Sequence, residues 1–102
     1  MNYEKMFESM GFDPDHAGTK CFEMATAQMM ENRAASLVND IYPAIAEARG
    51  TSWKSVERSM RYALRRAEES PYFADSWRKM GGWREPTVGA VVRRAARAAH
   101  ED

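Results

Sequence analysis

Hydrophobic residues recur at helical intervals along the whole chain, and no segment shows the strict alternation of a half-buried strand. The first apolar stripe predicts a short helix that stops at Gly11. It consists of Tyr3, Met6, Phe7 and Met10. Residues 12–18 hold a proline, two aspartates and a glycine, a composition typical of a turn. Thr19 is then expected to cap a second helix that runs to about Asn32.

The helical period continues beyond the second helix but is interrupted by Pro43. Because proline cannot donate a hydrogen bond to the preceding turn, we expect a kink or a new helix start there, with Pro43 in a first turn. Gly50 is expected to end this helix as a C-terminal cap. Thr51 or Ser52 then opens the longest predicted helix, which runs to about Ser70.

The C-terminal third predicts a short helix up to Met80, a loop through Gly81 and Gly82, and a last helix that Thr87 can cap. The apolar stripe of the last helix consists of Val88, Val91, Val92, Ala95 and Ala99. The pattern therefore predicts an all-α fold, a compact domain of five to six helices. A length of 102 residues is typical of one domain, and we expect residues 1–102 to form it.

Several large apolar side chains leave two interpretations open. Met24, Met29 and Met30 are interpreted as core filling rather than as an adaptable binding groove. Trp77 and Trp83 either cover the core beneath the loop or form an exposed patch for a partner, and the core is the favoured interpretation.

Composition excludes several classes of protein. Cys21 is the single cysteine, which excludes an intramolecular disulfide and is typical of a reduced compartment. The N-terminus has no signal-peptide pattern, and no run approaches the ~18 apolar residues of a membrane span, so we expect a cytoplasmic protein. His16 and His100 lack metal-ligand spacing, and no phosphate loop or nucleophile–base motif is present. We therefore expect no metal, no cofactor and no enzymatic activity.

The formal net charge is zero, but the charges are unevenly distributed. Residues 1–48 hold three basic and eight acidic side chains, a net of −5, whereas residues 49–102 hold twelve basic and seven acidic, a net of +5. Such a molecule can present a basic face to phosphates while its other half stays acidic. Chance segregation in a short chain is the alternative.

The long predicted helix is apolar on one side and basic on the other. Its predicted buried stripe consists of Trp53, Val56, Met60, Ala63, Leu64 and Ala67. Nearly opposite, within an arc of about 60° at 100° per residue, lie Lys54, Arg58, Arg61 and Arg65. Such a helix after a short helix and a glycine turn fits a helix-turn-helix, here about residues 42–70, whose second helix enters the major groove of DNA.

The residue types on this face suit base and phosphate recognition. The arginine fork can donate two hydrogen bonds to guanine, and Glu57 can accept one from cytosine. Tyr62 or Ser55 can reach phosphate oxygens, whereas Trp53 is expected in the core. The expected DNA-binding residues are Lys54, Ser55, Glu57, Arg58, Arg61, Tyr62 and Arg65.

A less specific interpretation of the same face stays open. Glu57 and Arg61 are four residues apart, as are Arg65 and Glu69, so they can form ordinary ion pairs on a solvated helix.

A second function class is a helical interaction module of the same fold that has lost DNA binding. It would dimerise or hold a partner through the last helix and the region from Trp77 to Trp83. A continuous basic strip along the long helix, extended by Arg49 or Arg93, would favour DNA binding. Acidic side chains that interrupt the strip would favour the module.

The segment around the glycine turn resembles a known family. It contains Tyr42-Pro43, Ile45-Ala46, Gly50-Thr51, Val56-Glu57-Arg58 and Arg61. This pattern is similar to the C-terminal effector domain of the sporulation master response regulator, stage zero sporulation protein A. The Met-rich second helix and the Pro86-Thr87 start of the last helix agree with it. The resemblance spans nearly the whole chain but is specific over about residues 40–67.

The resemblance implies a six-helix domain that binds duplex DNA through Glu57, Arg58 and Arg61. It also implies binding as a homodimer to paired sites, and contact of residues 71–84 with a sigma subunit of RNA polymerase. The family commonly has His at the position of Tyr62, which implies a different base preference here. The family's receiver domain is absent from residues 1–102, so the chain is expected to be either a fragment or a stand-alone regulator.

Overall fold

The computed structural model describes residues 2–82 and 84–101, and these residues form six α-helices and one π-helical turn. The elements are α1 (Tyr3–Ser9), α2 (Ala17–Glu31), η1 (Leu37–Ile41), α3 (Tyr42–Arg49), α4 (Trp53–Glu68), α5 (Phe73–Lys79) and α6 (Val88–Glu101). No strand occurs in the described residues. The all-α prediction is therefore confirmed.

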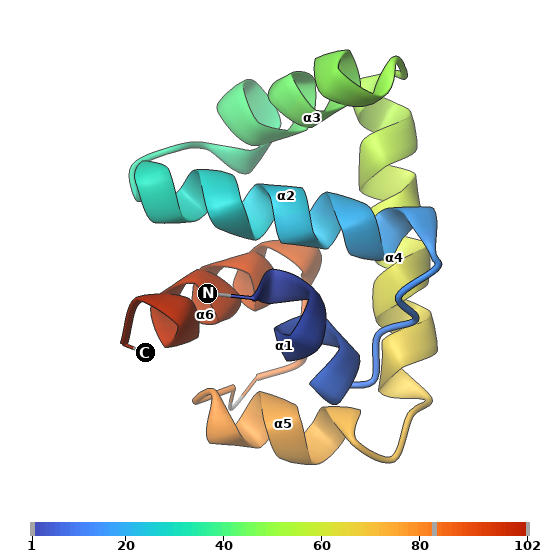
Figure 1. The fold of residues 1–102 in the computed structure, drawn as a ribbon, viewed down its shortest axis with the longest axis vertical. Helices are drawn as coiled ribbons and strands as arrows, with labels where there is room; N and C mark the ends of the chain where they lie inside the picture. Colours follow the sequence, from blue (N-terminus) through green and yellow to red (C-terminus); the bar gives the residue numbers. More distant parts are fainter. Residues whose placement is uncertain (1, 83, 102) are drawn as a thin grey trace.

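The helices pack around α2. As Figure 1 shows, α2 and α6 run side by side, α4 crosses near one end of both, and α3 lies at the start of α4. The buried stripe predicted for α6 is confirmed, because its five apolar residues are all at most 8% exposed. Met29 is buried in the core, and Met24 and Met30 pack against it, as the core-filling interpretation required.

An aromatic cluster joins α1, the turn after it and α2 to α5, which it reaches through the contact of Phe12 with Phe73 at 6.1 Å. The rings of Phe7, Phe12 and Phe22 lie with centroids 5.0–5.6 Å apart, in edge-to-face and tilted arrangements. Such contacts add to the apolar area that each ring buries. Trp77 stacks on Phe73 at 6.3 Å and donates a hydrogen bond from Nε1 to the carbonyl oxygen of Arg84 at 2.9 Å. Trp77 therefore belongs to the core, whereas Trp83 lies outside the described residues.

The start of α2 differs from the sequence prediction. His16, not Thr19, caps the helix, because its Nδ1 accepts a hydrogen bond from the Gly18 backbone N–H at 2.9 Å. The sequence predicts Gly18 in the turn of residues 12–18, yet it lies inside α2. A Cβ on Gly18 would collide with the carbonyl group of Ser59, so the missing side chain is what lets α2 approach α4 closely.

The predicted break near Pro43 and its place in a first helical turn are confirmed. Pro43 lies in the first turn of α3, where its missing N–H costs no hydrogen bond. The break before it takes the form of the π-helical turn η1, in which the Ile41 N–H donates to the carbonyl oxygen of Ser36 at 3.0 Å. The periodicity of the sequence did not distinguish this wider turn from a kink.

Candidate nucleic-acid interface

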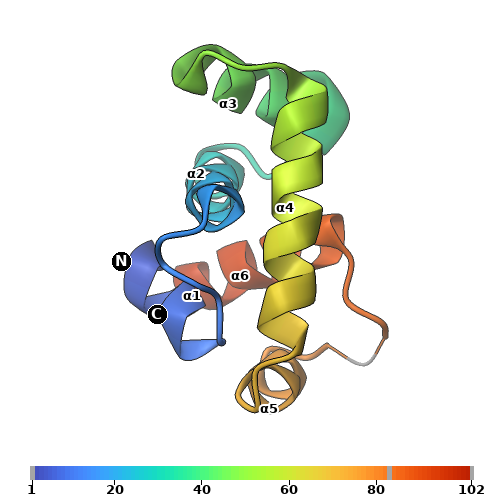
Figure 2. The same ribbon diagram turned by 90° about the vertical axis from the view of Figure 1, so that its right-hand side faces the viewer.

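The turn between α3 and α4 is built by one glycine and one serine. Gly50 has φ +66°, and the Thr51 N–H donates to the carbonyl oxygen of Ala46 at 2.9 Å, which closes the end of α3. Ser52 then caps α4, because its Oγ accepts a hydrogen bond from the Ser55 N–H at 3.2 Å. The Gly50 cap is thus confirmed, and of the two predicted candidates, Thr51 and Ser52, it is Ser52 that caps α4. Figure 2 shows α3 lying at the start of α4.

The two sides of α4 differ sharply in exposure. The inward side is buried, as predicted for Val56, Met60, Ala63, Leu64 and Ala67. The outward side is exposed at Lys54, Arg58, Arg61, Tyr62 and Arg65. Ser55 and Glu57 are half-buried at its edges. We call this outward side the basic face, and it brings together all seven side chains that the sequence proposed for DNA contact.

Trp53 does not join the buried stripe, contrary to the prediction. Its side chain is 45% exposed, and the Lys54 ammonium lies 5.9 Å from its ring centroid. Trp53 is the first residue of α4, a turn before the first buried residue, Val56. A helical stripe is buried only where other elements cover it. Periodicity alone therefore predicted a buried stripe that begins too early, at Trp53.

Glu57 and Arg61 form a two-contact ion pair on the basic face. Arg61 Nε lies 2.7 Å from Glu57 Oε1, and Arg61 Nη2 lies 3.3 Å from Oε2. The i, i+4 pairing that the sequence left open is therefore present. Arg58 and Arg65 form no hydrogen bond or ion pair with the described residues. Their guanidinium groups remain available to a ligand.

The buried tyrosine Tyr42 links this pair to α6. Burial raises the pKa of the Tyr42 hydroxyl, and the nearby Glu57 carboxylate raises that pKa further, whereas Arg61 and Arg93 lower it. Arg93 from α6 thus lies within electrostatic reach of the same hydroxyl as Arg61 from α4. Arg49, at the end of α3, lies instead within electrostatic reach of Cys21, whose pKa it lowers.

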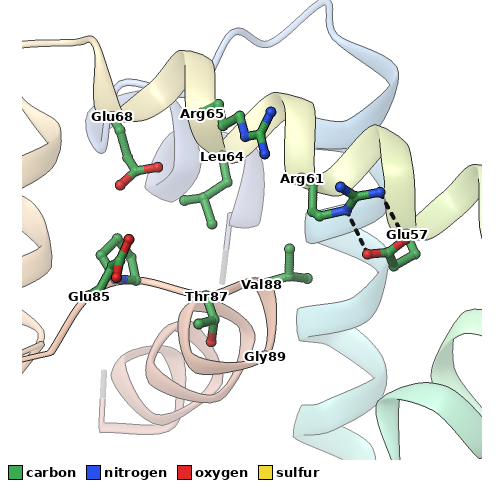
Figure 3. A pocket seen from close by; sticks show the side chains of 10 residues that line it. Glu57, Arg61, Leu64, Arg65, Glu68, Glu85, Thr87, Val88 and Gly89 are labelled. Carbon is green, nitrogen blue, oxygen red and sulfur yellow. Dashed lines mark hydrogen bonds and ion pairs between the residues drawn. The ribbon is translucent and has the colours of Figure 1, made fainter.

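A hollow separates the second half of α4 from the start of α6. Figure 3 shows the carboxylates of Glu68 and Glu85 directed toward one another across it, with Arg65 beside them. Burial raises the pKa of Glu68, and Glu85 raises it further, whereas Arg65 lowers it. With Glu57, three carboxylates line the hollow against Arg61 and Arg65. The hollow therefore holds one more carboxylate than guanidinium groups, and it shares Glu57, Arg61 and Arg65 with the basic face.

His16 and Cys21, which the sequence analysis considered as metal ligands, have structural roles in the fold. His16 caps α2, Cys21 is buried, and burial raises the pKa of its thiol despite the nearby Arg49. Within residues 2–82 and 84–101, no three side chains of His, Cys, Asp or Glu are grouped so as to hold a metal ion. None of the helices in that part of the chain has the length and apolar character needed to cross a bilayer.

The fold and the face together define a helix-turn-helix domain of the DNA-binding type. The family model described as the sporulation initiation factor Spo0A C terminal matches residues 3–73, and the chain belongs to this family. The family comprises DNA-binding effector domains of response regulators that control transcription in sporulation. No curated protein and no solved structure matches the chain significantly. The matched residues include α1 to α4, whereas α6 lies beyond them.

Proposed function

We propose that this chain is a sequence-specific regulator of transcription that reads duplex DNA with the basic face of α4 in the major groove. The observation that carries the proposal is the exposed, cationic side of α4, held opposite a buried stripe by the capped turn at Gly50. In helix-turn-helix domains the second helix reads base edges from such a side, and the first helix supports it.

The roles of the side chains follow from their chemistry. Arg58 is exposed and suits a bidentate contact with guanine O6 and N7. Arg61 is oriented by Glu57, which can itself accept from a cytosine amino group. Phosphate contacts are assigned to the remaining members of the basic face, namely Lys54, Ser55, Tyr62 and Arg65. The exposed Tyr62 hydroxyl would give this chain its own preference at one position.

We further propose that residues 1–102 act as one unit that binds paired sites as a homodimer, and that residues 71–84 contact a sigma subunit. These proposals rest on family membership. A DNA-binding role would place the chain in the cytoplasm, with the chromosome. The alternative is an interaction module without DNA binding, and it has less support because the matching family consists of DNA-binding effector domains.

Selection of the preferred duplex from a random pool tests the proposal directly. At a stated salt concentration we expect enrichment of one motif, and an affinity for that duplex that falls linearly on a log–log plot against salt. If no motif is enriched and affinity does not depend on salt, the proposal is wrong and the interaction module replaces it.

A further inference from the structure

The end of α3, the glycine turn and the first two residues of α4 form one exposed end of the molecule. Residues 47–54 are all exposed, and we call them the tip. A Cβ added to Gly50 would meet no atom of the described residues within 4 Å, so the turn faces open space. Figures 1 and 2 show α3 and the start of α4 at the end of the fold opposite α5. A large partner can therefore approach the tip freely.

Trp53 places a large apolar surface on the tip. Its side chain is 45% exposed, although tryptophan is among the more buried residue types on average. The packing of the core does not require it there, because the buried stripe of α4 begins at Val56. Since each Cα–Cβ bond of a helix tilts toward the N-terminus, the Trp53 side chain starts out in the direction of the turn. The indole is thus available to a partner that meets the N-terminal end of α4.

Lys54 adds a positive charge beside this apolar ring. Its ammonium lies 5.9 Å from the Trp53 ring centroid, in a cation–π arrangement. Lys54 belongs to the basic face, whereas Trp53 is rotated from it by about 100°, on the side of the buried stripe. Arg49 and Glu47 are the other charged residues of the tip, which leaves it with a net charge of +1 (two basic, one acidic). An apolar ring with an adjacent cation suits a partner that combines an apolar surface with an anion.

One nucleotide of duplex DNA has this combination. Its deoxyribose presents C–H groups and is bonded directly to a phosphate, so an indole can cover the sugar while an ammonium neutralises the phosphate. In helix-turn-helix complexes the second helix lies in the major groove and the first helix crosses the DNA backbone. Trp53 lies where the two helices meet, at the edge of the basic face rather than at its centre. The backbone, rather than a base edge, is therefore the part of the duplex that reaches the tip.

We propose that Trp53 packs on a deoxyribose of the DNA backbone while Lys54 binds the phosphate attached to that sugar. The inference rests on the proposed function and adds to it a contact that the sequence analysis assigned to the core. Contacts with sugar and phosphate carry no sequence information directly, and they fix the register of the recognition helix on the duplex.

The first test compares Trp53→Ala with Lys54→Gln on the selected duplex and on a scrambled one, by fluorescence anisotropy over a range of salt. For Trp53→Ala we expect a loss of affinity of about five- to twentyfold on both duplexes, which corresponds to burial of roughly 40–70 Å² of apolar surface. Its log–log salt slope should match that of the wild type, because an apolar contact releases no counterions. Lys54→Gln should instead reduce the slope by about 1.

The matched control is Tyr72→Ala, which removes an exposed aromatic side chain just before α5, at the other end of the fold. Its affinity for both duplexes should equal that of the wild type. Urea unfolding and far-ultraviolet circular dichroism establish that each variant is folded.

The second test measures the cover on the indole directly and uses a conservative variant. Acrylamide quenching of tryptophan fluorescence is compared between the wild type and Trp53→Phe, so that the signals of the other two tryptophans cancel. The difference, which reports Trp53, should fall when the duplex is bound. This readout decides the matter even if Trp53→Ala does not fold.

The outcomes separate the two proposals. If the wild type binds the motif and Arg58→Ala weakens that binding, but Trp53→Ala binds as the wild type does or Trp53 stays open to acrylamide, only the inference about the tip is overturned. A loss confined to the selected duplex also overturns it, because the indole would then lie on a base. If the wild type shows no binding that depends on salt, the proposed function itself fails.

Discussion

Glu57 holds Arg61 through two contacts, 2.7 and 3.3 Å long, one helical turn apart on the outward side of α4. The pair lies next to Arg58, which has no such partner among the described residues. In the unbound domain the two arginines therefore have different surroundings. Arg61 is oriented and partly neutralised by Glu57, whereas Arg58 is solvated. This difference leads to distinct expectations for substitutions on the same helix.

Replacing Glu57 by glutamine should release Arg61 for phosphate. We expect tighter binding to random-sequence duplex, with a salt slope steeper by about 1, and a smaller ratio of specific to non-specific affinity. Stability should change by no more than about 0.5 kcal/mol, because the pair is exposed and four residues apart. Anisotropy titrations with the selected and a scrambled duplex measure both affinities. Unchanged specificity would show that Glu57 is a surface ion-pair partner only.

Arg58→Ala should weaken binding to the selected duplex by about 1–3 kcal/mol and relax specificity at one base pair. The control is Arg66→Ala, a substitution of the same type on the same helix. Arg66 is rotated about 100° from Arg65, outside the arc of Lys54, Arg58, Arg61 and Arg65, and its Nη2 lies 3.6 Å from Asp13 Oδ2. Its loss should reduce affinity little. If Arg58→Ala and Arg66→Ala lose the same affinity, Arg58 makes no specific contact and the prediction is wrong.

Gly18→Ala should destabilise the domain by at least about 2 kcal/mol, because the added Cβ collides with the Ser59 carbonyl group and forces α2 away from α4. Gly50→Ala is the comparison. No atom lies within 4 Å of its added Cβ, so only the positive φ is strained, at about 1 kcal/mol. Urea unfolding gives both free energies. The prediction fails if Gly50→Ala is the more damaging of the two.

Stability should fall in alkaline solution partly because of Tyr42. Burial, with Glu57, raises the pKa of its hydroxyl in the folded state above the ordinary 10.0. The unfolded chain therefore ionises first, and the stability that Tyr42 contributes below pH 10 is lost as pH rises from the unfolded to the folded pKa. Tyr42→Phe removes this contribution, so its free energy of unfolding should decline less over the same pH range. Urea unfolding of both proteins from about pH 8 to pH 11 measures the difference.

Most of the helices and caps were predictable because their causes are local. Apolar spacing set the helices, Gly50 and Ser52 set the turn between α3 and α4, and Thr87 caps α6 by accepting from the Ala90 N–H at 3.1 Å. The composition of the basic face was predictable for the same reason, since side chains four residues apart share a side of any helix. Which of these side chains contact DNA stays a prediction.

The sequence by itself thus determined an all-helical domain, the position of its turn and one amphipathic helix with arginines on its outer side. The tertiary structure decided which positions are covered and which distant charges meet. It left Trp53 exposed because no element covers the start of that stripe, and it placed Gly18 inside α2 because α4 approaches there. It also brought Arg33 beside Arg93, sixty residues later in the chain. Burial and long-range juxtaposition depend on how helices pack, and a local pattern carries no information about that packing.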